Sequence, residues 1–366
     1  MSNRVEYKDQ TVLEAARDRI SHIFDSFDNV VVSVSGGKDS TVLFNLCHAE
    51  AQRRGREIGV FFLDQEAEYE ATITQIRHLL SNDGVTPYWY QVPFDLTNAT
   101  SFDEYHFRAW ETGVEWMRPK DEQAIHSIDG DYPERFYDFM EWFERQQPAS
   151  TAMMVGLRSK ESMNRFRSVT ENEGYDGIPW TTATTGDDIY RVYPIYDWRF
   201  GDIWKYIDNN DLRYNRIYDY MYADEGINKR NMRVSNLIHE KSYHALLKLR
   251  KYEPDTFSKL TERLDGVHFA SIYTGRKHAL DVDDLPSAFD SWQEYRDFLL
   301  DTTPSDKTDR FRDRFEQQPD HEEVYKAQCR QLLINDWENN VPVTGKGIDE
   351  DLERVWRDRL AIDQQS

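Results

Sequence analysis

Hydrophobic positions in the N-terminal part of the chain follow two alternating patterns. Apolar residues at helical spacing alternate with short runs that are rich in β-branched and aromatic residues. The helical pattern covers 12–24, 41–54 and 71–80, and the short runs cover 30–34, 58–63 and 88–92. Runs of the second kind are typical of strands that are buried on both faces of a parallel sheet. The alternation therefore predicts an α/β fold, in which helices flank an open parallel sheet.

The pattern changes in the middle of the chain. The segment from about 100 to 150 is rich in Trp, Phe and Tyr and has few strand signals, which indicates a helical insertion. Strand signals return at 152–155 and 189–193, and the spacing after them predicts a helix over 198–207.

The last third of the chain shows only helical periodicity and charge. Phe289, Trp292, Tyr295 and Phe298 share one helix face, for example. We therefore expect an α/β domain over 1–215, with the insertion inside it, and a mostly helical C-terminal domain over 216–366.

Charge narrows the choice of partners. The 366 residues include 45 Lys and Arg and 67 Asp and Glu, a formal net charge of −22, which disfavours nucleic acid and anionic membranes except where basic residues cluster. Such a cluster lies between Arg213 and Arg233 and is interleaved with tyrosines. It could bind the phosphates of a nucleotide or of nucleic acid, or it could simply offset the acidic surface.

Two further features concern the compartment. The N-terminus has no apolar signal core, and no stretch approaches the roughly 20 apolar residues that cross a bilayer. We expect a soluble, cytoplasmic protein that does not enter a membrane.

Cys47 and Cys329 lie far apart and outside any CxxC pattern, so we expect neither a disulfide framework nor a zinc ribbon.

The strongest chemical signal is the sequence SGGKDS, which lies between an expected strand and an expected helix. Its glycines allow backbone N–H groups to approach a ligand closely, and the helix N-terminus behind them favours an anion. Lysine adds a positive charge, the serines add hydroxyl groups, and aspartate is suited to Mg²⁺ or to capping the helix. The residues are Ser35, Gly36, Gly37, Lys38, Asp39 and Ser40. The spacing is too short for a Walker A loop.

This hexapeptide, in its strand–loop–helix context, resembles the signature of the PP-loop ATP pyrophosphatases. The resembling branch includes the phosphoadenosine phosphosulfate (PAPS) reductases. The resemblance continues at Asp64, which ends the strand over 58–63, and at VGLRSKESMNR, where Arg158 and Arg165 are spaced to share a helix face. It also includes the Pro-x-x-x-Trp segment that ends at Trp198, so it covers roughly 25–215.

The resemblance implies an adenine nucleotide alpha-hydrolase-like fold that binds ATP and Mg²⁺. ATP would be cleaved between its α- and β-phosphates, an unknown acceptor would become adenylylated, and pyrophosphate would leave. By resemblance, Lys38, Asp39, Arg158 and Arg165 are the expected catalytic residues. The loop residues and Asp64 would bind the nucleotide, which could also be PAPS-like. Asp39 and Asp64 would bind Mg²⁺.

Two weaker motifs, WETGVEWMRP and DGVHFASIYTGR, resemble the DUF3440 group, which includes proteins similar to immunoglobulin-binding regulator A. That group implies an alternative, a nucleotide-binding regulator that acts through a ParB-like partner protein. A second alternative is an enzyme that modifies nucleic acid. The chain departs from assimilatory PAPS reductases because it has no Glu-Cys-Gly-Leu-His tail. We therefore do not expect thiol-dependent PAPS reduction.

Overall fold

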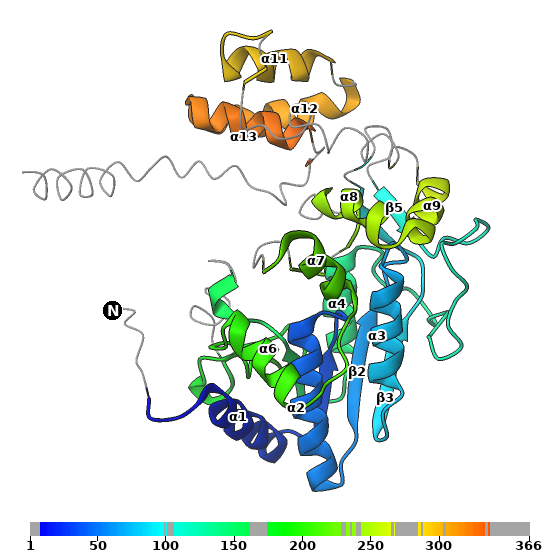
Figure 1. Ribbon diagram of the computed structural model, residues 1–366, viewed down its shortest axis with the longest axis vertical. Helices are drawn as coiled ribbons and strands as arrows, with labels where there is room; N and C mark the ends of the chain where they lie inside the picture. Colours follow the sequence, from blue (N-terminus) through cyan, green and yellow to red (C-terminus); the bar gives the residue numbers. More distant parts are fainter. Residues whose placement is uncertain are drawn as a thin grey trace, which may run out of the picture. The chain divides into compact units, whose positions relative to one another are not determined.

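The computed structural model places the elements of the N-terminal part around one sheet (Figure 1). The described residues are 8–98, 100, 106–161, 174–227, 232–234, 236–238, 243–264, 267, 285–286, 288–302, 305–333 and 336. They fall into two compact units, one formed by 1–96 and 108–236 and the other by 97–107 and 237–366.

The first unit contains a six-stranded sheet in the order β3-β2-β1-β6-β8-β7. Its strands are β1 (Asn29–Ser33), β2 (Ile58–Leu63), β3 (Val85–Tyr90), β6 (Thr151–Val155), β7 (Thr181–Ala183) and β8 (Ile189–Val192). Pairing is parallel from β3 to β8, with Val32 opposite both Val60 and Met154, and only the edge strand β7 runs antiparallel to its neighbour. The carboxyl ends of the parallel strands therefore share one edge of the sheet.

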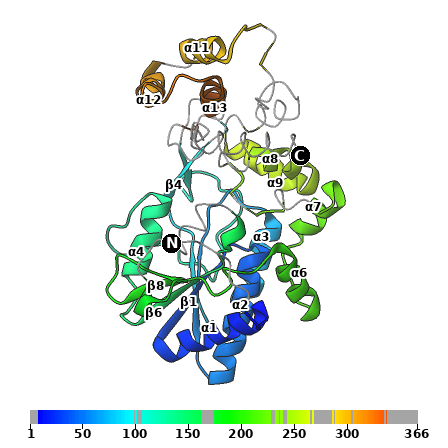
Figure 2. The same ribbon diagram turned by 90° about the vertical axis from the view of Figure 1, so that its left-hand side faces the viewer.

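One face of this sheet is covered by four helices (Figure 2). They are α1 (Val12–Ser26), α2 (Lys38–Arg54), α3 (Glu70–Leu80) and α6 (Phe200–Asn209). Their apolar faces pack with Val30 and Val32 of β1 and Val60 of β2 in one buried cluster. The other face is covered by α4 (Phe136–Arg145), whose Phe143 stacks on Phe61 at 4.1 Å between ring centroids. Because both faces are covered, the central strands read as continuous apolar runs.

The aromatic-rich middle of the chain is only partly helical. Its described residues supply α4 and the strand β5 (His106–Ala109), which pairs with β4 (Phe94–Thr97) in a separate two-stranded sheet. Short 3₁₀ turns follow at η1 (Ser159–Glu161) and η2 (Tyr175–Gly177). The first unit continues through α7 (Ile217–Glu225) and reaches residue 236. A division at residue 215 stays a prediction.

The second unit is helical in its described C-terminal part, as the periodicity predicts. Its helices are α8 (Tyr243–Tyr252), α9 (Pro254–Arg263), α11 (Trp292–Thr302), α12 (Ser305–Phe315) and α13 (Glu322–Leu333). Leu300, Phe311, Phe315 and Leu332 join α11, α12 and α13 in a small apolar core. Among all helices of the described residues, none is both long and apolar enough to cross a membrane.

Candidate functional site

The SGGKDS segment forms the turn from β1 into α2, which begins at Lys38. Gly36 has φ +66°, and a Cβ there would lie 2.8 Å from Cγ2 of Thr72 in the first turn of α3. Asn215 then donates hydrogen bonds to the Gly36 carbonyl (3.1 Å) and to Oγ1 of Thr72 (3.0 Å). The loop is therefore held tightly against α3, and only glycine fits its left-handed conformation there.

Hydrogen bonds inside the loop fix its shape. The Ser35 N–H donates to Oγ of Ser40 at 3.2 Å, and the Ser40 hydroxyl donates to the Gly37 carbonyl at 3.0 Å. Gly37 is the N-cap of α2 and contributes no side chain, so the first turn of the helix presents backbone N–H groups at the loop. This arrangement suits the binding of phosphate oxygens.

Three of the predicted site residues meet at the start of α2. Asp39 accepts from Nζ of Lys38 at 3.0 Å and from Nε of Arg158 at 2.6 Å. Lys38 and Arg158 are 2% and 5% exposed. Burial lowers the pKa of Lys38, and the charge of Asp39 acts in the opposite direction. The structure thus gathers two buried cations and one carboxylate at the carboxyl end of the sheet, where open α/β sheets bind ligands.

Gly156 explains how Arg158 reaches this place. It follows the last residue of β6, and a Cβ on it would lie 3.1 Å from the Asp39 carbonyl carbon and from the Ser40 nitrogen. Such contacts are tighter than those of most Cβ atoms, so a glycine allows the chain to pass directly over the first turn of α2 without a shift of the backbone. The Gly-x-Arg spacing therefore has a local physical cause.

Other predicted basic residues are only partly described. Arg165 lies outside the described residues, as do residues 228–231 of the basic segment. Arg213 is described and contributes its carbonyl, which accepts from Gln75 at 3.2 Å. Arg216 precedes α7, and its side chain is 83% exposed.

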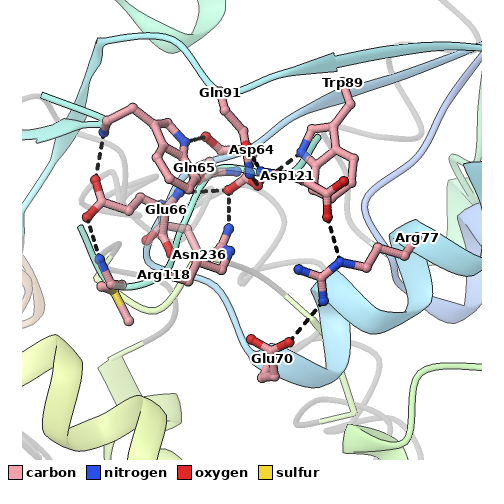
Figure 3. Close-up of polar contacts among 12 residues, drawn as sticks. Asp64, Gln65, Glu66, Glu70, Arg77, Trp89, Gln91, Arg118, Asp121 and Asn236 are labelled. Carbon is pink, nitrogen blue, oxygen red and sulfur yellow. Dashed lines mark hydrogen bonds and ion pairs between the residues drawn. The ribbon is translucent and has the colours of Figure 1, made fainter. Parts of the chain in front are cut away.

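Asp64 lies at the end of β2 in a different environment (Figure 3). Its side chain is fully buried, and four donors already contact its two oxygens. Arg118 and the Glu66 N–H contact Oδ1, while the indole of Trp89 (3.0 Å) and the amide of Gln91 (2.9 Å) contact Oδ2. These contacts weigh against Asp64 as a magnesium ligand, because every acceptor direction of the carboxylate is in use.

The WETGVEWMRP motif encloses this strand end. Its Trp110 and Met117 donate backbone N–H groups to Glu66, at 2.6 Å and 3.1 Å, and its Arg118 pairs with Asp64. No direct signal in the sequence pointed to Arg118, although a buried carboxylate requires a charged or polar partner somewhere in the chain. The motif therefore has a structural explanation that is separate from the phosphate loop.

Glu68 is a third carboxylate at this strand end. It is 5% exposed, and burial together with the charge of Asp64 raises its pKa from 4.5 to about 8. Arg118 acts in the opposite direction. Glu68 is therefore largely protonated at neutral pH, and sequence reasoning missed it because loop carboxylates are normally exposed.

The cysteines do not provide thiolate chemistry in this arrangement. Cys47 is fully buried in α2, where burial raises the pKa of its thiol far above the usual range. Burial also raises the pKa of Cys329 to about 12. Both thiols stay protonated at neutral pH, and a protonated thiol is a poor nucleophile. Within the described residues, no group of three or more His, Cys, Asp or Glu side chains is arranged to hold a metal ion.

Comparisons with known proteins support the family resemblance that the SGGKDS loop suggested. The model of the phosphoadenosine phosphosulfate reductase domain matches residues 29–226, and a domain of unknown function, DUF3440, matches 226–338. An uncharacterized protein of Escherichia coli K12, YbdN, is 34% identical over 320 residues, which cover 83% of this chain and 78% of that protein. An adenosine 5'-phosphosulfate reductase of Neisseria meningitidis is 26% identical over 29% of this chain and 44% of its own length.

Solved structures are more distant. An FMN adenylyltransferase of Candida glabrata, in complex with FMN and the ATP analogue AMPCPP, superposes with a TM-score of 0.37 at 14% identity. The match covers 59% of this chain and 65% of that enzyme.

Proposed function

Because the chain belongs to the phosphoadenosine phosphosulfate reductase domain family, we propose that it binds Mg-ATP and cleaves the bond between the α- and β-phosphates. The observation that carries this proposal is the meeting of Lys38, Asp39 and Arg158 at the SGGKDS loop. The binding of a nucleoside triphosphate with its metal ion requires positive charge, a carboxylate and backbone N–H groups such as those of a helix N-terminus.

Each residue has a role in this proposal. The N–H groups from Gly36 to Lys38 and the ammonium group of Lys38 would bind the oxygens of the departing pyrophosphate. Arg158 would hold the α-phosphate or the acceptor through its guanidinium group. The predicted second arginine, Arg165, stays a prediction. Catalysis would then depend on positioning and on stabilisation of the charge that develops on the phosphates.

Magnesium fits one of the two carboxylates that the sequence suggested. Asp39 belongs to the loop and its side chain is 17% exposed, and Mg²⁺ usually binds one or two carboxylates together with phosphate oxygens. Asp64 does not fit, since its oxygens are occupied. Bound magnesium would neutralise part of the phosphate charge, and Asp39 would position it.

The transfer conserves all atoms. An anionic oxygen of the acceptor forms a bond to the α-phosphorus, and the bond from that phosphorus to the oxygen bridging to the β-phosphorus breaks. Pyrophosphate leaves with the electron pair of the broken bond, and the acceptor retains AMP. A second nucleophile can then displace AMP, which makes the acceptor an activated intermediate.

Pyrophosphate release from Mg-ATP tests this proposal. We expect release by the wild-type protein and its loss in Lys38→Ala, because the substitution removes the buried cation of the loop. Lys205→Ala is the matched control, since Lys205 is exposed on α6. Full release in Lys38→Ala would contradict the proposal.

Added acceptors would identify the acceptor class. Sulfate, DNA and tRNA are the first choices, and the exposed Arg216, Tyr220 and Tyr222 at and within α7 support including nucleic acid. Stimulation by one additive would identify the class of acceptor.

A nucleotide-binding regulator that acts through a ParB-like protein is the second candidate. The observation that favours it is that both cysteines are buried with protonated thiols, unlike a thiol-dependent reductase. ATP binding without any pyrophosphate release would favour this regulator over the enzyme.

A further inference from the structure

The phosphate loop already has an occupant from its own chain. Tyr218 of α7 is 2% exposed, and its hydroxyl oxygen accepts a hydrogen bond from the Lys38 N–H at 3.1 Å. A Cβ built on Gly37 would lie 3.3 Å from the same oxygen. The hydroxyl thus lies directly on the loop and uses a backbone N–H group that the proposed function assigns to a phosphate oxygen.

The side chain of the same lysine is also occupied. Its Nζ donates to the carbonyl oxygen of Met232 at 3.2 Å and lies 5.4 Å from the ring centroid of Tyr218 and 5.6 Å from that of Phe200. Both the backbone N–H and the ammonium group of Lys38 are therefore held by residues that follow the α/β core in sequence. These contacts join positions 180 and 194 residues apart.

A phosphate group is a stronger acceptor than either occupant. Burial raises the pKa of Tyr218 well above its usual value, so its oxygen is that of a neutral phenol. Hydrogen bonds from N–H groups and ammonium groups to an anionic oxygen are roughly twice as strong as those to a neutral oxygen. Phosphate oxygens would therefore make stronger hydrogen bonds with both groups of Lys38 than the present acceptors make.

We propose that Tyr218 and the Met232 carbonyl are placeholders for nucleotide phosphates, and that nucleotide binding displaces them from Lys38. This rests on the proposed role of the loop in phosphate binding and adds its regulation. The displaced segment extends into residues 226–338, the part that matches the domain of unknown function. Occupancy of the loop would consequently be reported to that part of the chain through Met232.

The first test compares the affinity of Mg-ATP for wild-type protein and Tyr218→Phe by calorimetry. The phenylalanine cannot accept the Lys38 hydrogen bond, so that bond no longer has to be broken. We expect binding about fivefold tighter, which is the gain that one ordinary hydrogen bond represents. Inorganic pyrophosphate, used as a second probe, should show the same gain because it carries only the phosphate part.

Tyr214→Phe is the matched control. Tyr214 and Tyr218 both pack edge-on against Trp204, each with ring centroids 5.3 Å apart. The hydroxyl of Tyr214, however, donates to Asp219 at 2.6 Å and not to the loop. We expect the Tyr214→Phe variant to bind Mg-ATP with the same affinity as the wild type.

The outcomes separate this inference from the proposed function. A wild-type protein that binds no ATP would contradict the proposed function itself. Binding that is lost in Lys38→Ala but is unchanged or weaker in Tyr218→Phe would overturn the displacement and leave the proposed function intact.

Hydrogen exchange of the unmodified protein gives a second measurement that does not depend on a variant. We expect the backbone amides of α7 to exchange faster when Mg-ATP is present, because the helix loses its contacts with the loop. Slower or unchanged exchange in α7, at ATP concentrations that saturate the protein, would overturn the displacement.

Discussion

Two neighbouring strand ends of the same sheet use buried charge in opposite ways. At the end of β1, the charges of Lys38, Asp39 and Arg158 meet beside a backbone N–H group that contacts only the neutral hydroxyl of Tyr218. At the end of β2, Asp64 is enclosed by Trp89, Gln91 and Arg118, and all of its acceptor directions are used. The comparison teaches that position at the ligand-binding edge of a sheet does not make a carboxylate a ligand group. A ligand would also have to break the contacts that the carboxylate already makes, and at Asp64 these include a buried ion pair with Arg118.

The largest effect is expected at the β2 end. Arg118→Ala removes the charged partner of Asp64 and leaves a buried carboxylate without compensation, which should lower the free energy of unfolding by about 3–5 kcal/mol. Urea denaturation measures this loss. The double variant Arg118→Ala with Asp64→Asn should recover part of it. A loss below about 1 kcal/mol, typical of an exposed ion pair, would show that this strand end is not a structural centre.

Arg158→Gln should produce the converse result at the β1 end. Removing one charge-stabilising donor commonly costs about a hundredfold in rate, so pyrophosphate release should fall by that order. The loss of stability should be smaller than in Arg118→Ala, because Asp39 is partly exposed and keeps its contact with Lys38. Arg53→Gln is the control, because Arg53 is exposed and pairs only with Glu50 among the contacts of the described residues. Equal rates in the two variants would remove Arg158 from the proposed site.

Gly156→Ala tests whether the approach of β6 to α2 matters. The added methyl group would lie 3.1 Å from two backbone atoms, which should destabilise the protein by about 1–3 kcal/mol and move Arg158 away from Asp39. Thermal unfolding and pyrophosphate release should both decline. Gly201→Ala serves for comparison, since a Cβ there meets nothing within 4 Å.

The remaining expected effect is the pH dependence that Glu68 causes. Its pKa is about 8 in the folded protein against 4.5 ordinarily, so the folded state binds more protons between these values. The stabilisation that protonated Glu68 contributes to the folded state is complete below pH 4.5 and is lost as the pH rises towards 8. The free energy of unfolding falls over this range by at most roughly 1.4 kcal/mol per pH unit. Unfolding measured from pH 5 to 8 should show this slope in the wild type and a flatter profile in Glu68→Gln.

The sequence predicted well those features that depend on residues close together in the chain. Strand β2 was predicted at its observed bounds, Ile58–Leu63, and the phosphate loop was found as six contiguous residues. Helix α2 begins three residues before the expected position, at Lys38, because the loop lysine and aspartate take helical conformation in its first turn. The short edge strand β7 was missed, since three residues carry no recognisable alternation.

Features that depend on distant residues could not be predicted in this way. Arg118 and Asp64 are 54 positions apart, and Tyr218 and Lys38 are 180 positions apart. No periodicity or local motif links such pairs, because only the folded chain brings them together. The position of Asp64 after β2 therefore suggested a magnesium ligand. Only the folded structure shows that its carboxylate is surrounded by donors from distant parts of the chain.

The two edges of the sheet also govern how the protein meets other copies of itself. Strand β3 carries Pro87, which has no N–H group to offer to a neighbouring strand, and Ile125 pairs with the backbone of Trp89 and Gln91 farther along. The opposite edge, β7, is only three residues long. Within the described residues, neither edge presents a long ladder of free donors and acceptors, so the folded sheet offers little template for a strand from another copy.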